Sequence, residues 1–292
     1  MIDVDASDQS AREAQWVRVG LAAVSLAYLT YLFTDARVDE NLRTLGVLVL
    51  GLGLVFPKVI GTRWWAWAVV TGVMVGGIAL RPLDVPNHHY MLSYFAGAIT
   101  VALTGRPEDH AALLRGNARW LIVALMGLAT LQRVLSPTFL DGSYIGYELT
   151  RGGFLEPVQP LLGEVAETAR ANDAAALAFR ETVPTPGDGV TLQSTTPTPR
   201  LAAYLFTAMI LTIEAWIALI MWRAPRSLLA HLSIWLFVVT LTVIRQEMTF
   251  ITVLCAVGLL SCPPTRPNIR LGYAVFTCLF AASVLKTLNV AV

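Results

Sequence analysis

Charged residues are scarce in this sequence. Asp, Glu, Lys and Arg together make up 14% of the 292 residues, whereas a soluble globular domain carries about 25%. Hydrophobic residues account for 55%, and the mean hydropathy is +0.61. This composition predicts an integral membrane protein. The formal net charge of +1 lacks the basic excess of a nucleic-acid-binding protein, so no nucleic-acid partner is expected.

Several chemical signatures are also missing. The three cysteines, Cys255, Cys262 and Cys278, do not have the spacing of metal ligands. They lie in or at the edge of apolar segments, where the simplest interpretation is a small buried hydrophobic side chain. The sequence contains no glycine-rich phosphate loop and no zinc-protease pattern. No metal and no cofactor is predicted from these signatures, while a bound quinone or lipid stays open.

The N-terminal residues 1–15 are polar and acidic. They lack the basic region and the short apolar core of a cleaved signal peptide. The first apolar segment is therefore expected to remain in the protein as a membrane anchor.

Apolar segments of nearly membrane-spanning length recur along the chain. A helix needs about 20 apolar residues, within a range of about 17–25, to cross the hydrocarbon layer. The segment 227–260 is too long for one span and has Arg245, Gln246 and Glu247 in its middle, so we divide it into two helices joined by a tight, solvated turn. With that division the expected spans are 17–33, 44–56, 64–80, 88–104, 120–135, 201–222, two within 227–260, and 271–288.

These segments predict an all-α fold, a polytopic membrane bundle of about nine transmembrane helices. Residues 1–16 precede the bundle, 17–140 form helices one to five, and 201–292 form helices six to nine. Residues 141–200 form the one sizeable insertion between them. The sequence leaves open whether the second and eighth helices cross completely.

The distribution of basic residues predicts the orientation. With the N-terminus placed in the cytoplasm, eleven Lys and Arg residues of the short loops fall inside and five fall outside. The tryptophans agree, because five of them lie at expected inner boundaries, namely Trp16, Trp64, Trp65, Trp120 and Trp222. We therefore expect a protein of the plasma (inner) membrane whose 141–200 insertion is extracytoplasmic.

The insertion 141–200 has its own pattern. Apolar residues share one helical face in its first half, which predicts a short amphipathic helix through Leu161, Leu162, Val165, Ala166 and Ala169. Its second half, 184–199, is rich in Pro and Thr and predicts an extended loop.

Ionisable residues near the membrane carry the functional hypotheses, because each is costly there. Two apolar helices joined by a basic turn, 87–142, place His88 and Arg133 at the same side and similar depth. His88 and His89, with Asp84 and Tyr90, form either a chemical site or an interfacial helix cap. Gln132 and Arg133 form either an anion site or a pair with Asp141 or a lipid headgroup.

Two further ionisable residues lie deeper. Glu214 falls in the sixth expected helix and His231 in the seventh, both in the inner half of the bundle. A hydrogen bond between them would lower the cost of burying each. This buried polar pair has a structural interpretation and, as the alternative, a role as a proton relay.

The motifs around these residues resemble the HTTM family, the membrane domain shared with vitamin K-dependent gamma-carboxylases. The resemblance rests on the order of five motifs between Pro86 and Pro263: Asn87-His88-His89-Tyr90, Gln132-Arg133 before Asp141-Gly142, Ile213-Glu214, Leu229-Ala230-His231-Leu232, and Leu259-Leu260-Ser261-Cys262-Pro263. It implies an HTTM-like fold, and a substrate or lipid site built from Asn87, His88, Gln132, Arg133 and Asp141.

The resemblance also implies a difference in chemistry. In the carboxylases a lysine deprotonates vitamin K hydroquinone and a histidine assists, and His88 matches that histidine. The lysine positions hold Gln132 and Arg133 here. A carboxamide is not a base, and a guanidinium keeps its proton because its pKa exceeds about 12. Since His88 and Arg133 are the remaining catalytic candidates, carboxylation is not expected.

Three function classes follow. The first is a non-catalytic membrane subunit or scaffold that packs against protein partners or lipid. The second is an enzyme acting on a quinone or lipid at the outer leaflet, with His88 and Arg133 as an anion clamp. The third is a transporter using Glu214 and His231, although the sequence shows no inverted repeat. The first class is preferred because the carboxylase base is replaced.

Overall fold

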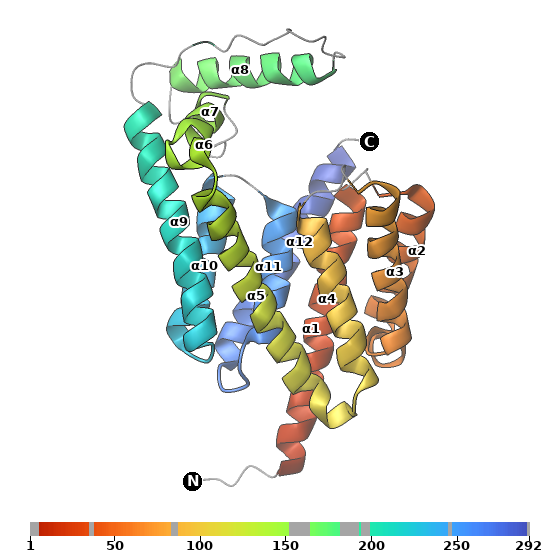
Figure 1. Ribbon diagram of the computed structural model, residues 1–292. Helices are drawn as coiled ribbons and strands as arrows, with labels where there is room; N and C mark the ends of the chain where they lie inside the picture. The colour runs from red at the N-terminus through yellow and green to blue at the C-terminus, as the bar shows by residue number, and fades with distance from the viewer. Residues whose placement is uncertain are drawn as a thin grey trace. The chain divides into compact units, whose positions relative to one another are not determined.

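The computed structural model describes residues 6–34, 38–82, 87–151, 164–181, 193, 199–244 and 247–290. All regular elements in these ranges are helical (Figure 1). They are α1 (Ala6–Thr34), α2 (Glu40–Val55), η1 (Pro57–Gly61), α3 (Trp64–Leu80), α4 (Asn87–Thr104), η2 (Pro107–Asp109), α5 (His110–Val134), α6 (Pro137–Leu140), α7 (Ser143–Arg151), α8 (Glu164–Glu181), α9 (Pro199–Arg223), α10 (Leu228–Ile244), α11 (Met248–Ser261) and α12 (Pro267–Val290).

Local sequence sets several of these helix ends. Asp39 caps α2, since its Oδ1 accepts hydrogen bonds from the backbone N–H of Asn41 at 3.0 Å and of Leu42 at 3.2 Å. Proline opens five of the elements, as expected where the first N–H needs no helical partner. These prolines are Pro57, Pro107, Pro137, Pro199 and Pro267.

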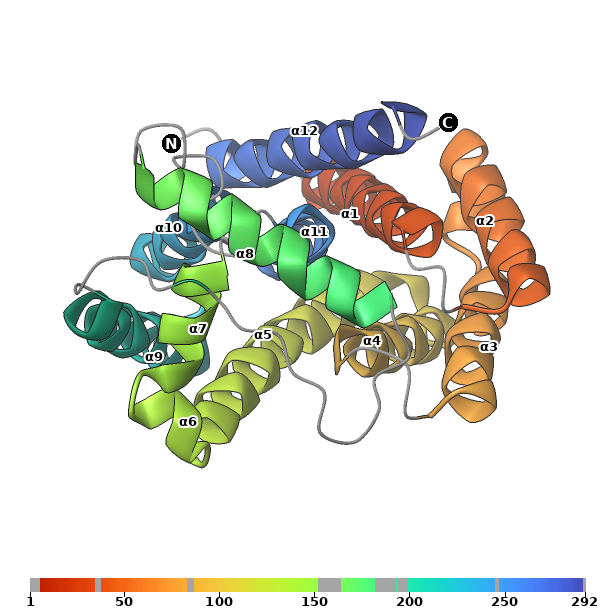
Figure 2. The same cartoon turned by 90° about the horizontal axis from the view of Figure 1, so that it is seen from above.

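The chain divides into two compact units. The first contains Met1–Leu125, Ile220–Ile234 and Met248–Val292, and the second contains Met126–Leu219 and Trp235–Glu247. In the first unit α1 packs against α2, α11 and α12, while α3 packs against α2 and α4 (Figure 2). Every residue of α11 from Ile251 to Ser261 is buried. A helix that is apolar on all sides belongs in an interior, and α11 has that place in this unit.

The second unit has a small core of its own. Phe139, Ile145, Ala203 and Ile244 are its buried members. The helix α8 lies against α7 and runs across the direction of α9 (Figure 1). The buried amide of Asn172 holds α8 in place, because its Nδ2 donates to the carbonyl oxygens of Thr150 and Gln193 at 2.9 Å each.

The helix expected in the insertion is present, with different bounds. It is α8, Glu164–Glu181, and it buries Ala169 on the expected face. The face was also expected to include Leu161 and Leu162, which lie outside the described residues, as do Asp84, Arg245 and Gln246.

Four of the described helices are long and apolar enough to cross a membrane, by length and composition. They comprise Ala11–Thr34, Pro107–Val134, Leu201–Arg223 and Pro267–Lys286. Trp64–Leu80, Leu228–Ile244 and Met248–Ser261 are apolar but shorter. At about 1.5 Å per residue, a helix of 14 to 17 residues reaches about 21–26 Å, less than the roughly 30 Å of a hydrocarbon core. Helices are present at all nine expected segments, and four of them have the length and composition of a membrane span.

Candidate functional site

The second unit joins two residues that the sequence placed in different hypotheses. Arg133, in the last turn of α5, forms an ion pair through Nη1 with Oε1 of Glu214 on α9. The Glu214 side chain is 3% exposed and that of Arg133 is 29% exposed. The carboxylate is therefore buried with a guanidinium as its counter-ion, which is the arrangement that makes a buried charge tolerable.

An aromatic ring completes the surroundings of Arg133. The guanidinium carbon lies 5.2 Å from the ring centroid of Phe139, a separation typical of a cation–π contact. Phe139 is itself buried in the core of the second unit. Arg133 is thus fixed by an acidic partner and by a core ring, so its role in the structure is to link α5 to α9 and α6.

Asp141, which the sequence predicts as a partner of Arg133, has a hydrogen-bond partner in Ser143. Asp141 Oδ1 accepts a hydrogen bond from the backbone N–H of Ser143 at 2.9 Å, and hydrogen bonds from Ser143 lower the pKa of this exposed carboxyl. Gln132 is exposed. The alternative partner expected for Arg133 was Asp141 or a lipid headgroup, whereas the structure gives it Glu214.

Of the two adjacent histidines, His89 is the buried one. Its ring is fully enclosed, with Nε2 2.8 Å from the carbonyl oxygen of Met74 and Nδ1 2.7 Å from the hydroxyl of Tyr31. A carbonyl can only accept, so Nε2 carries the proton, and in a neutral ring Nδ1 accepts from the tyrosine. This ring is held as a cross-link between α1, α3 and α4.

Gly77 leaves room for the His89 ring because it has no side chain. A Cβ at Gly77 would lie 3.0 Å from His89 Nε2, so a side chain there would press on the histidine. His88 is half-buried and its ring meets Tyr31 edge-on, with centroids 5.3 Å apart. The side chain of Asn87 lies outside the described part of the chain. The motif therefore places one histidine in the packed interior and the other beside Tyr31.

His231 has a tyrosine as its partner. Its Nδ1 lies 3.3 Å from the hydroxyl of Tyr273, and the same hydroxyl donates to the His231 carbonyl oxygen at 3.4 Å. Both residues are fully buried in the first unit. Gly258 allows this contact, because a Cβ there would lie 2.5 Å from the tyrosine ring. Glu214 and His231 thus each have another partner, and a hydrogen bond between the two remains a prediction.

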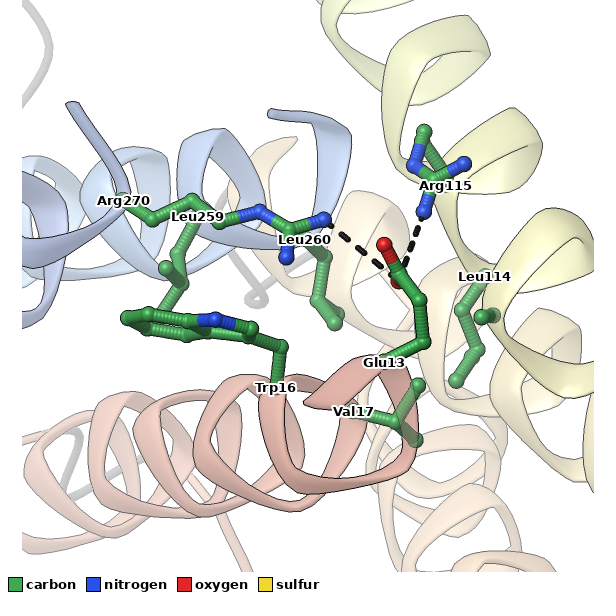
Figure 3. Close-up of a pocket in the computed structure, with 9 residues that line it drawn as sticks. Glu13, Trp16, Val17, Leu114, Arg115, Leu259, Leu260 and Arg270 are labelled. Atoms are coloured by element: carbon green, nitrogen blue, oxygen red, sulfur yellow. Dashed lines mark hydrogen bonds and ion pairs between the residues drawn. The ribbon is translucent and has the colours of Figure 1, made fainter. Parts of the chain in front are cut away.

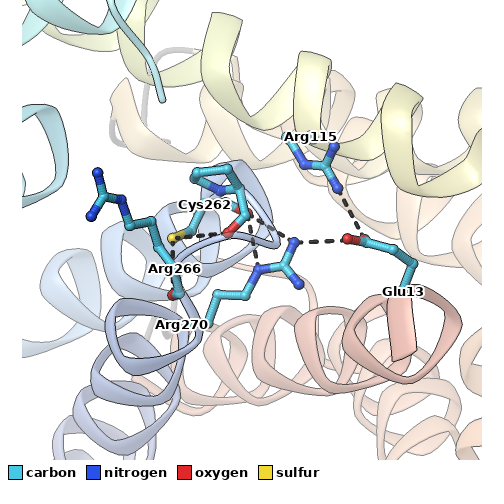
Figure 4. A network of polar contacts seen from close by, with 6 residues as sticks. Glu13, Arg115, Cys262, Arg266 and Arg270 are labelled. Carbon is cyan, nitrogen blue, oxygen red and sulfur yellow. Dashed lines mark hydrogen bonds and ion pairs between the residues drawn. The ribbon is translucent and has the colours of Figure 1, made fainter. Parts of the chain in front are cut away.

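A third polar cluster was missed by sequence reasoning. Glu13 of α1 meets Arg115 of α5 and Arg270 of α12, all in the first unit (Figure 4). Arg115 and Arg270 are among the eleven basic residues that the charge distribution predicts on the inner side. The sequence does contain a pattern that indicates burial of Glu13. Its helical face also carries Val17, Leu21, Val24 and Tyr28, of which Figure 3 shows Val17 one turn after Glu13. The last three of these side chains are fully buried.

The three cysteines differ in burial. Cys255, Cys262 and Cys278 are free, and the first two are buried while Cys278 is exposed. Burial raises the pKa of the Cys262 thiol, in the turn after α11, to about 12, against the opposing effect of Arg270, Arg115 and Arg266. Within the described residues no three His, Cys, Asp or Glu side chains form a group that could hold a metal ion.

No family model, curated protein or solved structure matches the chain. The chemistry of the site is therefore argued from its own residues. Arg133 is already paired with Glu214, and a guanidinium does not accept a proton at neutral pH.

Proposed function

We propose that this chain is a non-catalytic integral membrane protein, a subunit or scaffold that packs against partner proteins or lipid. Its fold in this proposal is an HTTM-like bundle of nine helices, with residues 1–16 in the cytoplasm and 141–200 outside. The Arg133–Glu214 ion pair is the observation that carries the proposal. It makes the arginine at the position of the carboxylase base a link between two helices.

The other buried polar residues support the same interpretation. His89 is engaged by Tyr31 and Met74, and His231 is engaged by Tyr273. A catalytic base needs access to a substrate proton, whereas both of these rings are fully buried. Polar groups enclosed in this way stabilise one arrangement of helices, which is what a scaffold requires.

The exposed surface supports a membrane and partner role. Large apolar side chains along α9 and α10 are exposed on the protein surface, where their contact with water would be unfavourable. The exposed ones include Leu201, Leu205, Trp216, Leu219, Leu232, Leu236, Val239 and Val243. In a bilayer these side chains contact lipid tails or the helices of another subunit.

Purification from native membranes in a mild detergent tests the proposal. The tagged chain should retain one or more membrane proteins in a fixed ratio through size-exclusion chromatography, and membranes with the untagged chain serve as the control. Retention of a quinone at His88, together with its turnover, would instead establish the outer-leaflet enzyme. Substrate-driven proton movement that depends on Glu214 and His231 would establish the transporter.

A further inference from the structure

The short helices α6 and α7 lie beside the first turns of α9, as both views of the molecule show (Figure 1, Figure 2). Phe139 of α6 and Ile145 of α7 share one core cluster with Ala203 and Phe206 of α9. The hydroxyl of Thr207 donates to the carbonyl oxygen of Phe139 at 3.4 Å. The two short helices are therefore packed along the side of α9 and not beyond its end.

The length of α9 gives the depth of this contact. Its membrane-length part, Leu201–Arg223, has 23 residues and is about 34 Å long at about 1.5 Å per residue, a little more than the roughly 30 Å of a hydrocarbon core. Thr207 comes six residues after Leu201 (207 − 201 = 6), which is about 9 Å along the helix. When α9 crosses a bilayer, α6 and α7 therefore lie at the boundary between headgroups and acyl chains.

The outward face of α7 is aromatic. Tyr144 and Tyr147 are exposed, whereas Glu148, the single carboxylate of α7, is only 5% exposed. A helix on the surface of a soluble protein has the opposite pattern, with its charged side chains outside. Tyrosine has an apolar ring and a polar hydroxyl, so it is enriched where a bilayer meets water. The pattern of α7 thus fits a membrane interface better than water.

The segment that leads into α7 also suits an interface. Leu135 and Leu140 are exposed, and so are the polar side chains of Thr138 and Asp141. Apolar side chains can enter the upper part of the acyl layer while polar ones stay among hydrated headgroups.

The turn before α7 connects this surface to that of α9. A Cβ at Gly142 would lie 3.4 Å from the ring of Tyr204, which is itself exposed in the first turns of α9. Leu201 and Leu205, next to Tyr204 on the same helix, are exposed as well. The exposed surface of α6 and α7 therefore continues into the part of α9 that faces lipid in the proposed function.

We propose that α6 and α7 form an interfacial anchor that rests in one leaflet of the bilayer, with Tyr144 and Tyr147 at the headgroup level. The surface binds the phospholipid interface through tyrosine and leucine side chains and requires no charged lipid. The inference rests on the membrane placement in the proposed function and adds which part of the insertion contacts lipid. The neighbouring helix α8 exposes Glu167 and Arg170 and stays in water.

Spin labelling of the full chain in phosphatidylcholine nanodiscs measures this depth. Each variant carries one added cysteine in a Cys278→Ser background, because Cys255 and Cys262 are buried. The accessibility of the nitroxide to oxygen, which concentrates in lipid, is compared with its accessibility to a water-soluble nickel chelate. A label at Tyr147→Cys should give an oxygen-to-nickel ratio severalfold higher than a label at Ala171→Cys, the control at an exposed position on α8.

Two further labels complete the test. Leu140→Cys, also exposed, should give a ratio similar to that of Tyr147→Cys, and it provides a second probe if loss of the tyrosine disturbs folding. Thr212→Cys, exposed near the middle of the membrane-length part of α9, should give a ratio higher than both.

The outcomes separate this inference from the proposed function. If the labels at 140 and 147 match the label at 171 while the label at 212 is in lipid, the interfacial anchor is refuted and the membrane placement is retained. If the label at 212 also matches the label at 171, the membrane placement in the proposed function fails as well. Labels at 140 and 147 that are shielded from both oxygen and nickel would assign the surface to a protein contact and overturn the lipid assignment.

Discussion

Arg133 in the last turn of α5 and Glu214 in the middle of α9 form an ion pair whose carboxylate is buried. The two residues are 81 positions apart in the sequence (214 − 133 = 81). Each is costly alone in an apolar environment, and together they form a nearly neutral unit. The pair joins the end of α5 to α9, the helix that follows the insertion.

Breaking this pair should destabilise the protein strongly. Arg133→Ala leaves the buried carboxylate of Glu214 without a counter-ion, and we expect a loss of about 3 kcal/mol in the free energy of unfolding. Chemical unfolding in detergent, followed by tryptophan fluorescence, measures it. Arg226→Ala, which removes an exposed arginine, is the matched control and should change the free energy by less than about 0.5 kcal/mol.

The double variant Arg133→Leu with Glu214→Leu tests whether the two charges act as a pair. Because both charges leave together, much of the stability lost in either single variant should return. Strictly additive losses from the two substitutions would show that Arg133 and Glu214 are not coupled.

The two histidines of the Asn-His-His-Tyr motif should differ sharply. His89→Leu leaves the Tyr31 hydroxyl and the Met74 carbonyl oxygen without their buried partner, and should cost about 2–3 kcal/mol. His88→Leu should cost less than about 1 kcal/mol, since that ring is only half-buried. Thermal unfolding of the two variants in the same detergent compares them, and a larger loss from His88→Leu would contradict this assignment.

The helices themselves were largely predictable from the sequence. The predicted segment 64–80 coincides with α3, and the division of 227–260 at Glu247 matches the ends of α10 and α11. Apolar length and charged interruptions determine such boundaries locally. The start of α1 was missed because its first turns, from Ala6, are polar and acidic, so the hydrophobic pattern alone placed the boundary near residue 17.

The polar pairs were not predictable in the same way. Glu214 and Arg133 had each been recognised as costly, but the sequence offered His231 and Asp141 as nearer partners. Which partner a buried charge meets depends on how helices rotate and pack, and periodicity along one helix does not contain that information. Glu13 was overlooked for a related reason, because its partners lie on helices that begin about a hundred or more residues later.

The proposed orientation gives a labelling prediction. In a Cys278→Ser background, a cysteine replacing the exposed Ala171 on α8 should react with an impermeant thiol reagent in intact cells. A cysteine replacing the exposed Ala224, between α9 and α10, should react only after lysis. The expectation follows from the excess of basic residues in the inner loops. The reverse pattern of labelling would overturn the orientation.

Incorporation of labelled carbon dioxide tests the non-catalytic assignment most directly. The purified chain, supplied with vitamin K hydroquinone and a glutamate-containing peptide, should give no more incorporation than the boiled protein. The Arg133→Lys variant should remain inactive too, because the nearby carboxylate of Glu214 would favour the protonated form of a lysine at this position. Hydroquinone-dependent incorporation by the unmodified chain would contradict the proposed non-catalytic function.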